Sequence, residues 1–477
     1  MGENSRIRLF ERAGAAGLAV LFFSGAAVAQ EPEEAAREAV ERDLYETQRT
    51  SDREVRRQTQ IPFEMVLSAP DNIQLNIDYA RQQIAAGDLK EAGATLERIL
   101  LLNPTLYDVR VLYGLVLYRL GLYDRARYEL ELALESGELP AALAAEAETY
   151  LGRIKYQQRR TRGALTITTG VDYESNRNQA PSSGQVLFSL PNPFNPNQFV
   201  TTTLASNPKV DDFAFVVSAQ GRVQHDLGTQ EGSLLHADIG FYHSDKTEFD
   251  SLDLNAASVA LGGTWYAGNW SVTPAVRGGF YWLDGEDYLA TYGGEVEVAY
   301  RWTPKFTTYV NFRGEEEDFR DTSDFGAASI RSGRRLSGRA GFTWRFSSRQ
   351  KLNVEGLYAD KNGEAVFETY DRYGVFAQHS MLLGRGAFSM IGFWAENSSY
   401  DGPDPFITPA ITRDEWLYRG RFTIGAPVSF FAPGLPEAIK DINLIAQYEY
   451  ETVDSNILNF DYKTHKAAFL ISKRIAF

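Results

Sequence analysis

Residues 460–477 read FDYKTHKAAFLISKRIAF, and this stretch at the end of the sequence decides the fold. Every second position, counted back from Phe477, is mainly apolar, and the positions between are mainly polar or small. The apolar set contains Phe469, Ile471, Ile475 and Phe477, with Lys473 as one interruption, and the other set contains Lys466, Ser472, Arg474 and Ala476. A period of two places alternate side chains on opposite faces of a strand. The stretch therefore predicts a strand with one apolar and one polar face.

The same alternation recurs through most of the sequence after residue 162. Strands that are apolar toward lipid and polar toward the interior build transmembrane β-barrels. We predict fourteen strands, at 163–174, 211–226, 232–245, 252–267, 269–283, 288–303, 305–317, 331–347, 350–360, 367–380, 386–399, 412–427, 440–453 and 460–477. Tight turns alternate with long polar loops at 175–210, 318–330 and 400–411, although the connection 429–440 on the tight-turn side is also long. An even strand number and this rhythm of connections are typical of a closed outer-membrane barrel.

Tryptophans cluster near the ends of the predicted strands. Trp265, Trp270, Trp302 and Trp344 lie near tight turns, Trp282 and Trp416 lie near long loops, and Trp394 does not fit this placement. Aromatic girdles occupy these positions at the two boundaries of a membrane. The tryptophans therefore support the same barrel.

The polar faces of the strands predict a charged barrel interior. The candidate lumen residues are Glu295, Glu297, Arg301, Glu315, Glu317, Arg335, Arg339, Arg345, Glu355, Arg419, Arg421, Glu449 and Glu451. Mixed charges of this kind could line a wet channel and select what passes. Alternatively, they pair with one another and hold the barrel in shape, which we favour for any single residue because such pairs are common.

The sequence before the barrel predicts three further segments. Residues 1–29 combine early arginines, a short apolar run and small residues before Gln30, which is typical of a secretory signal peptide. Residues 30–69 are rich in Glu, Arg and Gln and predict a polar linker. Residues 70–160 change to a helical period and predict a periplasmic helical domain, and the barrel takes up 161–477.

The helical segment contains an internal repeat with a spacing of 34 residues. Small residues match across the two units: Ala80 with Gly114, Gly87 with Gly121, and Ala92 with Ala126. This spacing is that of tetratricopeptide repeats, whose paired helices approach closely at small residues. Such repeats usually bind a peptide or protein, although a short array could also serve as a spacer. The fold class predicted is an α + β two-domain protein, with a small tetratricopeptide solenoid followed by a 14-stranded antiparallel transmembrane β-barrel.

Composition and charge exclude several classes of function. The net charge of −15 argues against nucleic acid as a partner, because phosphate binding needs clustered cations. The chain has no Cys, and its five His are scattered without metal-ligand spacing or a catalytic triad context. We therefore expect no enzyme activity, no catalytic residues, no metal and no cofactor.

One segment carries a resemblance to a known family. Residues 170–181 read GVDYESNRNQAP, and Gly170, Ser175, Asn176 and Asn178 match a Gly…Ser-Asn-x-Asn-x-Ala segment that opens certain barrels. Together with the order of signal peptide, repeats and barrel, this segment resembles the surface lipoprotein assembly modulators (Slam). The resemblance implies an outer-membrane protein that helps surface lipoproteins or secreted proteins cross that membrane. Its repeats would recruit the substrate, the barrel would form the passage, and Ser175, Asn176 and Asn178 would act at the pore mouth or cap a strand end.

The expected partners and two alternative functions follow from the same architecture. We expect outer-membrane lipid around the barrel, a lipoprotein or secreted protein as substrate, and the barrel-assembly machinery at the C-terminal strand. The first alternative is an exopolysaccharide-export porin, in which a longer solenoid usually precedes sixteen strands. The second is a general diffusion porin with a periplasmic docking domain.

Overall fold

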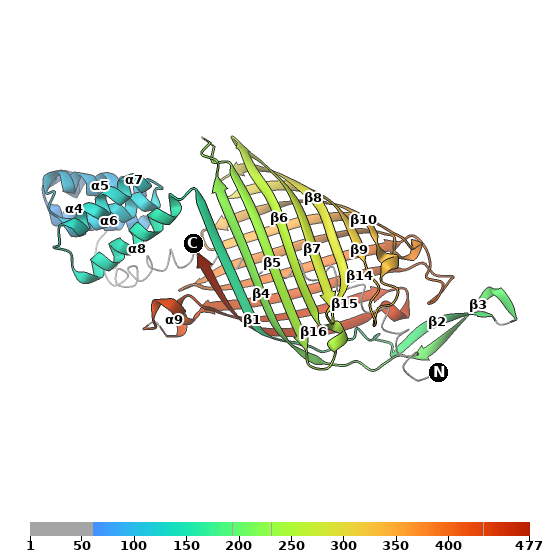
Figure 1. Ribbon diagram of the computed structural model, residues 1–477. Helices are drawn as coiled ribbons and strands as arrows, with labels where there is room; N and C mark the ends of the chain where they lie inside the picture. Colours follow the sequence, from blue (N-terminus) through green and yellow to red (C-terminus); the bar gives the residue numbers. More distant parts are fainter. Residues whose placement is uncertain (1–60, 193, 230, 433) are drawn as a thin grey trace. The chain divides into compact units, whose positions relative to one another are not determined.

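The computed structural model describes residues 61–477 except 193, 230 and 433 (Figure 1). These residues form two compact units, a helical one and a barrel. The boundary between the two units lies between Arg162 and Gly163. The predicted signal peptide and residues 30–60 of the predicted linker lie outside the described residues. None of the helices described combines the length and apolar character needed to cross a membrane.

Six helices make up the described part of the helical unit. They are α3 (Phe63–Ser68), α4 (Ile73–Ala86), α5 (Leu89–Leu102), α6 (Tyr107–Arg119), α7 (Tyr123–Glu135) and α8 (Ala141–Gln157). Helix α4 packs against α5, α6 packs against α7, and α5 and α6 join the two pairs. Helix α3 lies in the segment predicted as linker, where six residues were too few to show a helical period.

Small residues shape the repeat as their spacing suggested. Ala80, Ala92 and Ala126 are completely buried in the core of the helical unit. A Cβ on Gly114 would lie 2.8 Å from the Leu130 side chain, so α6 and α7 approach at this glycine. The helical region is thus established, whereas its membership of the tetratricopeptide class stays a prediction.

The two remaining repeat positions end helices. Gly87 has a φ of 94° at the end of α4, and Gly121 has a φ of 76° just after α6. This left-handed conformation is strained for residues with a Cβ, which explains why Gly follows both helices.

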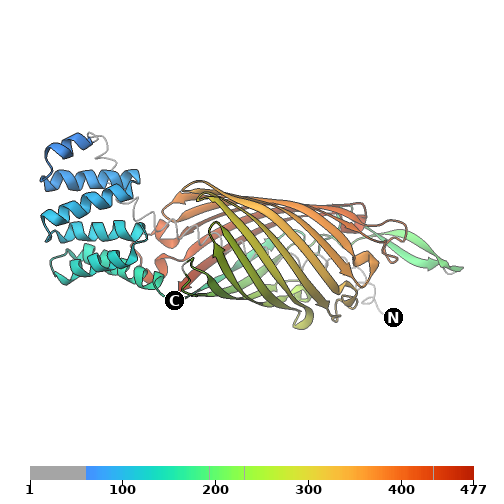
Figure 2. The ribbon, with the colours of Figure 1, turned by 90° about the horizontal axis from the view of Figure 1, so that it is seen from above.

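Fourteen antiparallel strands close into a barrel, which confirms the predicted architecture (Figures 1 and 2). They are β1 (Thr161–Glu174), β4 (Asp212–Asp226), β5 (Leu234–Lys246), β6 (Leu254–Ala267), β7 (Trp270–Leu283), β8 (Glu286–Thr303), β9 (Phe306–Phe319), β10 (Gly333–Ser347), β11 (Gln350–Gly363), β12 (Tyr370–Gly384), β13 (Ala387–Tyr400), β14 (Asp414–Pro427), β15 (Asn443–Ser455) and β16 (Tyr462–Ala476). From β4 to β16, each strand pairs with the next along the chain. Strand β1 pairs with β16 and closes the barrel.

The alternation of side chains follows the pattern of the terminal strand. Phe469, Ile471 and Ile475 are exposed on the outer face of β16, whereas Thr464 and Ser472 are buried on its inner face. Tryptophans 265, 270, 302 and 344 are likewise exposed on the outside. Trp394, the residue that did not fit the girdles, is buried inside, where its ring packs against Phe376.

The main difference from the prediction lies in the first long loop. Within residues 175–210, β2 (Gln185–Asn192) and β3 (Asn195–Ala205) form a separate two-stranded sheet. The Asn459 side chain holds this hairpin by bonding both the N–H and the C=O of Leu187, at 2.7 and 3.0 Å. A contact over 272 residues cannot be seen in local sequence. The connection 429–440 contains two short helices, α9 (Val428–Phe431) and α10 (Glu437–Lys440).

Candidate functional site

Side chains of the described residues line two cavities inside the barrel. The larger one, of about 440 Å³, is lined by inward side chains of β7 to β16, and the smaller one, of about 300 Å³, by those of β1, β4 to β7 and β14 to β16. Alternation brings every second side chain of these strands to the interior. The cavities are therefore the part of the barrel that a solute could occupy.

The structure places most of the predicted lumen charges on the cavity walls. Those on the wall of the larger cavity are Glu315, Glu317, Arg335, Arg339, Glu355, Arg419 and Glu451, and those on the wall of the smaller one are Arg421 and Glu449. Glu295, Glu297, Arg301 and Arg345 line neither cavity. Arg301 and Arg345 are exposed beside the short turns, because the strands extend to the barrel rim there.

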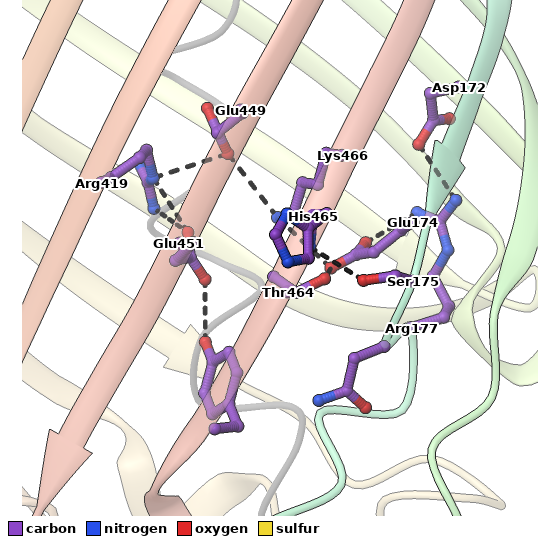
Figure 3. Close-up of polar contacts among 12 residues, drawn as sticks. Asp172, Glu174, Ser175, Arg177, Arg419, Glu449, Glu451, Thr464, His465 and Lys466 are labelled. Atoms are coloured by element: carbon purple, nitrogen blue, oxygen red, sulfur yellow. Dashed lines mark hydrogen bonds and ion pairs between the residues drawn. The ribbon is translucent and has the colours of Figure 1, made fainter. Parts of the chain in front are cut away.

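A dense ion network covers the inner face of β14, β15 and β16 (Figure 3). Arg419 lies 2.7 Å from Glu451, and the Nε of Arg421 donates to Glu449 at 2.6 Å. The Tyr462 hydroxyl donates to the second oxygen of Glu451 at 2.9 Å. Since Glu451 is completely buried, its charge requires these partners.

The network continues across the seam of the barrel to β1. The Lys466 ammonium lies 3.5 Å from Glu174 and 3.9 Å from Glu449, and so connects carboxylates of β1 and β15 (Figure 3). Arg177 donates to Glu174 at 3.1 Å and to Asp172 at 3.0 Å. This wall is thus a structural ion cluster, in line with the pairing alternative for the lumen charges.

Two arginines on the opposite wall are paired less closely, although Lys361 lies 2.6 Å from Glu317 there. Arg335 lies 3.6 Å from Glu317, and Arg339 lies 3.8 Å from Glu355, both beyond hydrogen-bond distance. The Arg339 side chain keeps 34% of its surface accessible, compared with 7% for Arg419. Side chains that are more accessible and more loosely held can exchange partners with water or with a bound solute. This wall of the larger cavity is therefore the better candidate for solute contact.

A third charged group lies beside the larger cavity. Glu295 accepts from Arg277 at 3.0 Å and from Arg313 at 2.8 Å, and so links β7, β8 and β9. Both arginines line the larger cavity, although the sequence did not single them out. Their position on the polar face of alternating strands was the signal that could have identified them.

The motif at residues 175–180 forms a turn inside the rim of the barrel. Asn176 is completely buried, and its side chain bonds both the N–H and the C=O of Ala180, at 2.9 and 3.0 Å. Its amide also donates to the Lys463 carbonyl at 3.2 Å. The Ser175 N–H donates to the His465 carbonyl, and the Ser175 hydroxyl accepts from the His465 N–H, both at 2.9 Å. Asn176 and Ser175 therefore fasten the turn to β16.

Asn178 fastens the other side of the same turn. Its side chain donates to the Pro208 carbonyl at 2.9 Å and accepts from the Val210 N–H at 3.2 Å. The residues between these anchors, Arg177 and Gln179, face the cavities. Sequence reasoning selected the anchors and missed Arg177 and Gln179, although their alternation with the two asparagines was visible in the motif.

Gly170, the first residue of the motif, lies on the seam between β1 and β16. A Cβ at this position would lie 2.1 Å from the Phe469 carbonyl oxygen and 2.9 Å from the Leu470 Cα. Real side chains do not tolerate such distances, so the two strand backbones approach closely only because residue 170 is Gly.

Comparisons with known proteins find likeness only at the level of fold. No family model and no curated protein matches the sequence. Among solved structures, the outer membrane protein OprD from Pseudomonas aeruginosa matches with a TM-score of 0.33 and 9% identity, over 67% of this chain and 94% of that one. OccAB1 from Acinetobacter baumannii gives 0.33 and 8%, over 66% and 97%. Values of this size carry no argument about the function of the present chain.

Proposed function

We propose that this protein is an outer-membrane channel for small polar solutes, as in the diffusion-porin alternative. The observation that carries the proposal is the closed barrel with apolar side chains outside and charged cavities inside. A closed barrel satisfies all its strand hydrogen bonds, which a lipid environment demands. An apolar outer face would be costly in water, and so it supports a membrane location.

The size of the interior supports small solutes as the cargo. The two cavities have volumes of about 300 and 440 Å³, which is the range of small-molecule sites. A folded domain of 100 residues has a radius of gyration of about 13 Å. Its volume is therefore far larger than that of either cavity.

Reconstitution tests the channel proposal directly. Purified full-length protein added to a planar lipid bilayer should insert in steps, and each step should raise the ion conductance. Membrane fractionation should place the protein in the outer membrane. A folded protein that inserts in the bilayer without conductance steps would contradict the proposal.

A second candidate is the translocation role implied by the Slam resemblance. The helical unit favours it, since paired helices with a 34-residue repeat are suited to peptide recruitment. Deleting the gene should then remove a particular lipoprotein or secreted protein from the cell surface. An unchanged set of surface proteins would count against this role.

The exopolysaccharide-export alternative receives less support. Its barrels were expected to have sixteen strands after a long solenoid, whereas this barrel has fourteen strands after six described helices. Loss of a matrix polymer after deletion of the gene would favour the exopolysaccharide-export alternative.

A further inference from the structure

We propose that the turn at residues 175–180 is the constriction of the channel, and that Gln179 is the residue that determines its selectivity. This inference rests on the proposed channel function. Among the described residues, Gln179 and Tyr281 are the two that line both cavities. Gln179 and Tyr281 therefore lie at the junction of the two cavities, where the turn narrows the lumen.

The two side chains differ in how they could act. Tyr281 is 5% exposed and packs in an apolar cluster with Leu283, Tyr288 and Phe319 on the wall. Gln179 is only partly buried, and it belongs to a turn rather than to a barrel strand. Tyr281 thus forms a fixed wall, whereas Gln179 offers a polar amide to whatever passes.

The turn is held on three sides, as a constriction requires. Asn176 and Ser175 bond to β16, Asn178 bonds to residues 208 and 210, and Arg177 reaches Asp172 and Glu174 on β1. The Arg177 backbone N–H also donates to the Val210 carbonyl at 2.9 Å. Residues tied in this way cannot swing out of the lumen without breaking several hydrogen bonds, among them the partly buried ones to Lys463, Asp172 and Glu174.

The backbone at Gln179 indicates that its position is imposed by these anchors. Its φ is 48°, in the left-handed region that residues with a Cβ seldom adopt. Such a conformation persists only where the surroundings fix it, and it is common at functional sites. The Gln179 N–H donates to the Asn176 carbonyl at 3.1 Å, which closes the turn.

The chemistry of the constriction predicts weak charge selection in the natural protein. Asp172 and Glu174 pair with the Arg177 charge at 3.0 and 3.1 Å, so the uncharged Gln179 amide is the group that the turn presents to the junction of the two cavities. We infer that small neutral hydrogen-bonding solutes pass most readily, because an amide both donates and accepts hydrogen bonds.

Two substitutions of one residue test the constriction. Gln179→Gly removes the side chain and relaxes the left-handed backbone, and the single-channel conductance should rise. Gln179→Lys adds a positive charge at the junction and should raise the anion-to-cation permeability ratio about fivefold, which corresponds to the ~1 kcal/mol between unit charges about 4 Å apart in water. Both quantities are measured in planar bilayers with the full-length protein, after gel mobility has shown that the barrel is closed.

Two further glutamines provide matched controls. Gln185→Lys places the same charge on the hairpin strand β2, outside both cavities, and should leave conductance and selectivity as in the natural protein. Gln447→Lys places a positive charge on the wall of the smaller cavity, at a position that does not line the larger one. It should shift the permeability ratio by much less than Gln179→Lys does.

The outcomes separate the two proposals. If the natural protein conducts and the Gln179 variants do not differ from it, or Gln447→Lys acts as strongly, the constriction is elsewhere and this inference is wrong. If the natural protein does not conduct, the channel function fails and the constriction fails with it.

Discussion

At the scale of single residues, the interior of this barrel is governed by how deeply each charge is buried. Glu451 has no accessible surface and bonds Arg419 and Tyr462, whereas the Asp287–Arg320 pair keeps more than half of both side chains accessible. Breaking a buried pair leaves an uncompensated charge, but an exposed charge remains hydrated. The same ionic contact therefore has a very different effect on stability in the two places.

Replacement of Glu451 tests this difference. Glu451→Gln should lower the free energy of unfolding by up to about 3–5 kcal/mol, because the buried Arg419 loses its closest counter-charge and keeps only Glu449, at 3.6 Å. The measurement is urea unfolding of the reconstituted protein, followed by tryptophan fluorescence.

The exposed pair supplies the control for this measurement. Asp287→Asn should change stability by about 0–1 kcal/mol, as is usual for exposed ion pairs. Equal effects of the two substitutions would show that water reaches Glu451 and that the ion cluster is not a buried structural unit.

At the scale of elements, the closure of the barrel depends on the pairing of β1 with β16. These strands are far apart in the sequence, and their register sets Glu174 opposite Lys466 and Gly170 opposite Leu470. The Thr168 hydroxyl also bonds the Ser472 hydroxyl at 3.0 Å across the seam. The seam thus depends on a close backbone approach that Gly170 alone permits.

A single methyl group should disturb this seam. Gly170→Ala places a Cβ against the Phe469 carbonyl, and we expect a lower yield of closed barrel, because one of the two backbones must move. Closed barrels resist unfolding in cold detergent, so gel mobility with and without heating measures the folded fraction.

Gly420 on β14 offers the matched substitution. A Cβ there would meet no atom within 4 Å, so Gly420→Ala should leave the folded fraction as it is in the natural protein. If Gly170→Ala folded as well as Gly420→Ala, the proposed steric reason for the glycine would be wrong.

At the scale of the whole molecule, two units have separate means of stabilisation. The helical unit has its own apolar core, with buried residues from Ile77 to Ile154. The barrel has little continuous apolar core and relies instead on a closed ladder of hydrogen bonds and on inward ion pairs. We therefore expect the barrel to fold without the helices.

An internal deletion tests this independence. Removal of residues 61–158 should leave a closed barrel with the conductance of the full-length protein, measured in planar bilayers. Under the translocation alternative, the same deletion should abolish surface display of the cargo while the barrel persists. Failure of the shortened protein to reach the membrane in a closed form would mean that the barrel needs the helical unit.

The sequence alone was enough for the architecture, because the information is local. Alternation in each segment marks a strand with one apolar face, and the number and order of the fourteen barrel strands follow from reading the segments one after another. Gly87 and Gly121 likewise mark helix ends through their own backbone preferences. The alternation of inward and outward positions also predicted that Glu315, Arg335 and Arg419 face the barrel interior, where they line the larger cavity.

Only the tertiary structure decided which of those charges are buried in pairs, where the hairpin β2–β3 is held, and which residue lies between the two cavities. Arg419 and Glu451 are 32 residues apart, and Leu187 and Asn459 are 272 apart. The turn that carries Gln179 is held in the lumen by hydrogen bonds to strands distant in the sequence, such as that of Asn176 to Lys463. Local sequence determines which face a side chain takes, but its burial and partners depend on strands that come together only when the barrel closes.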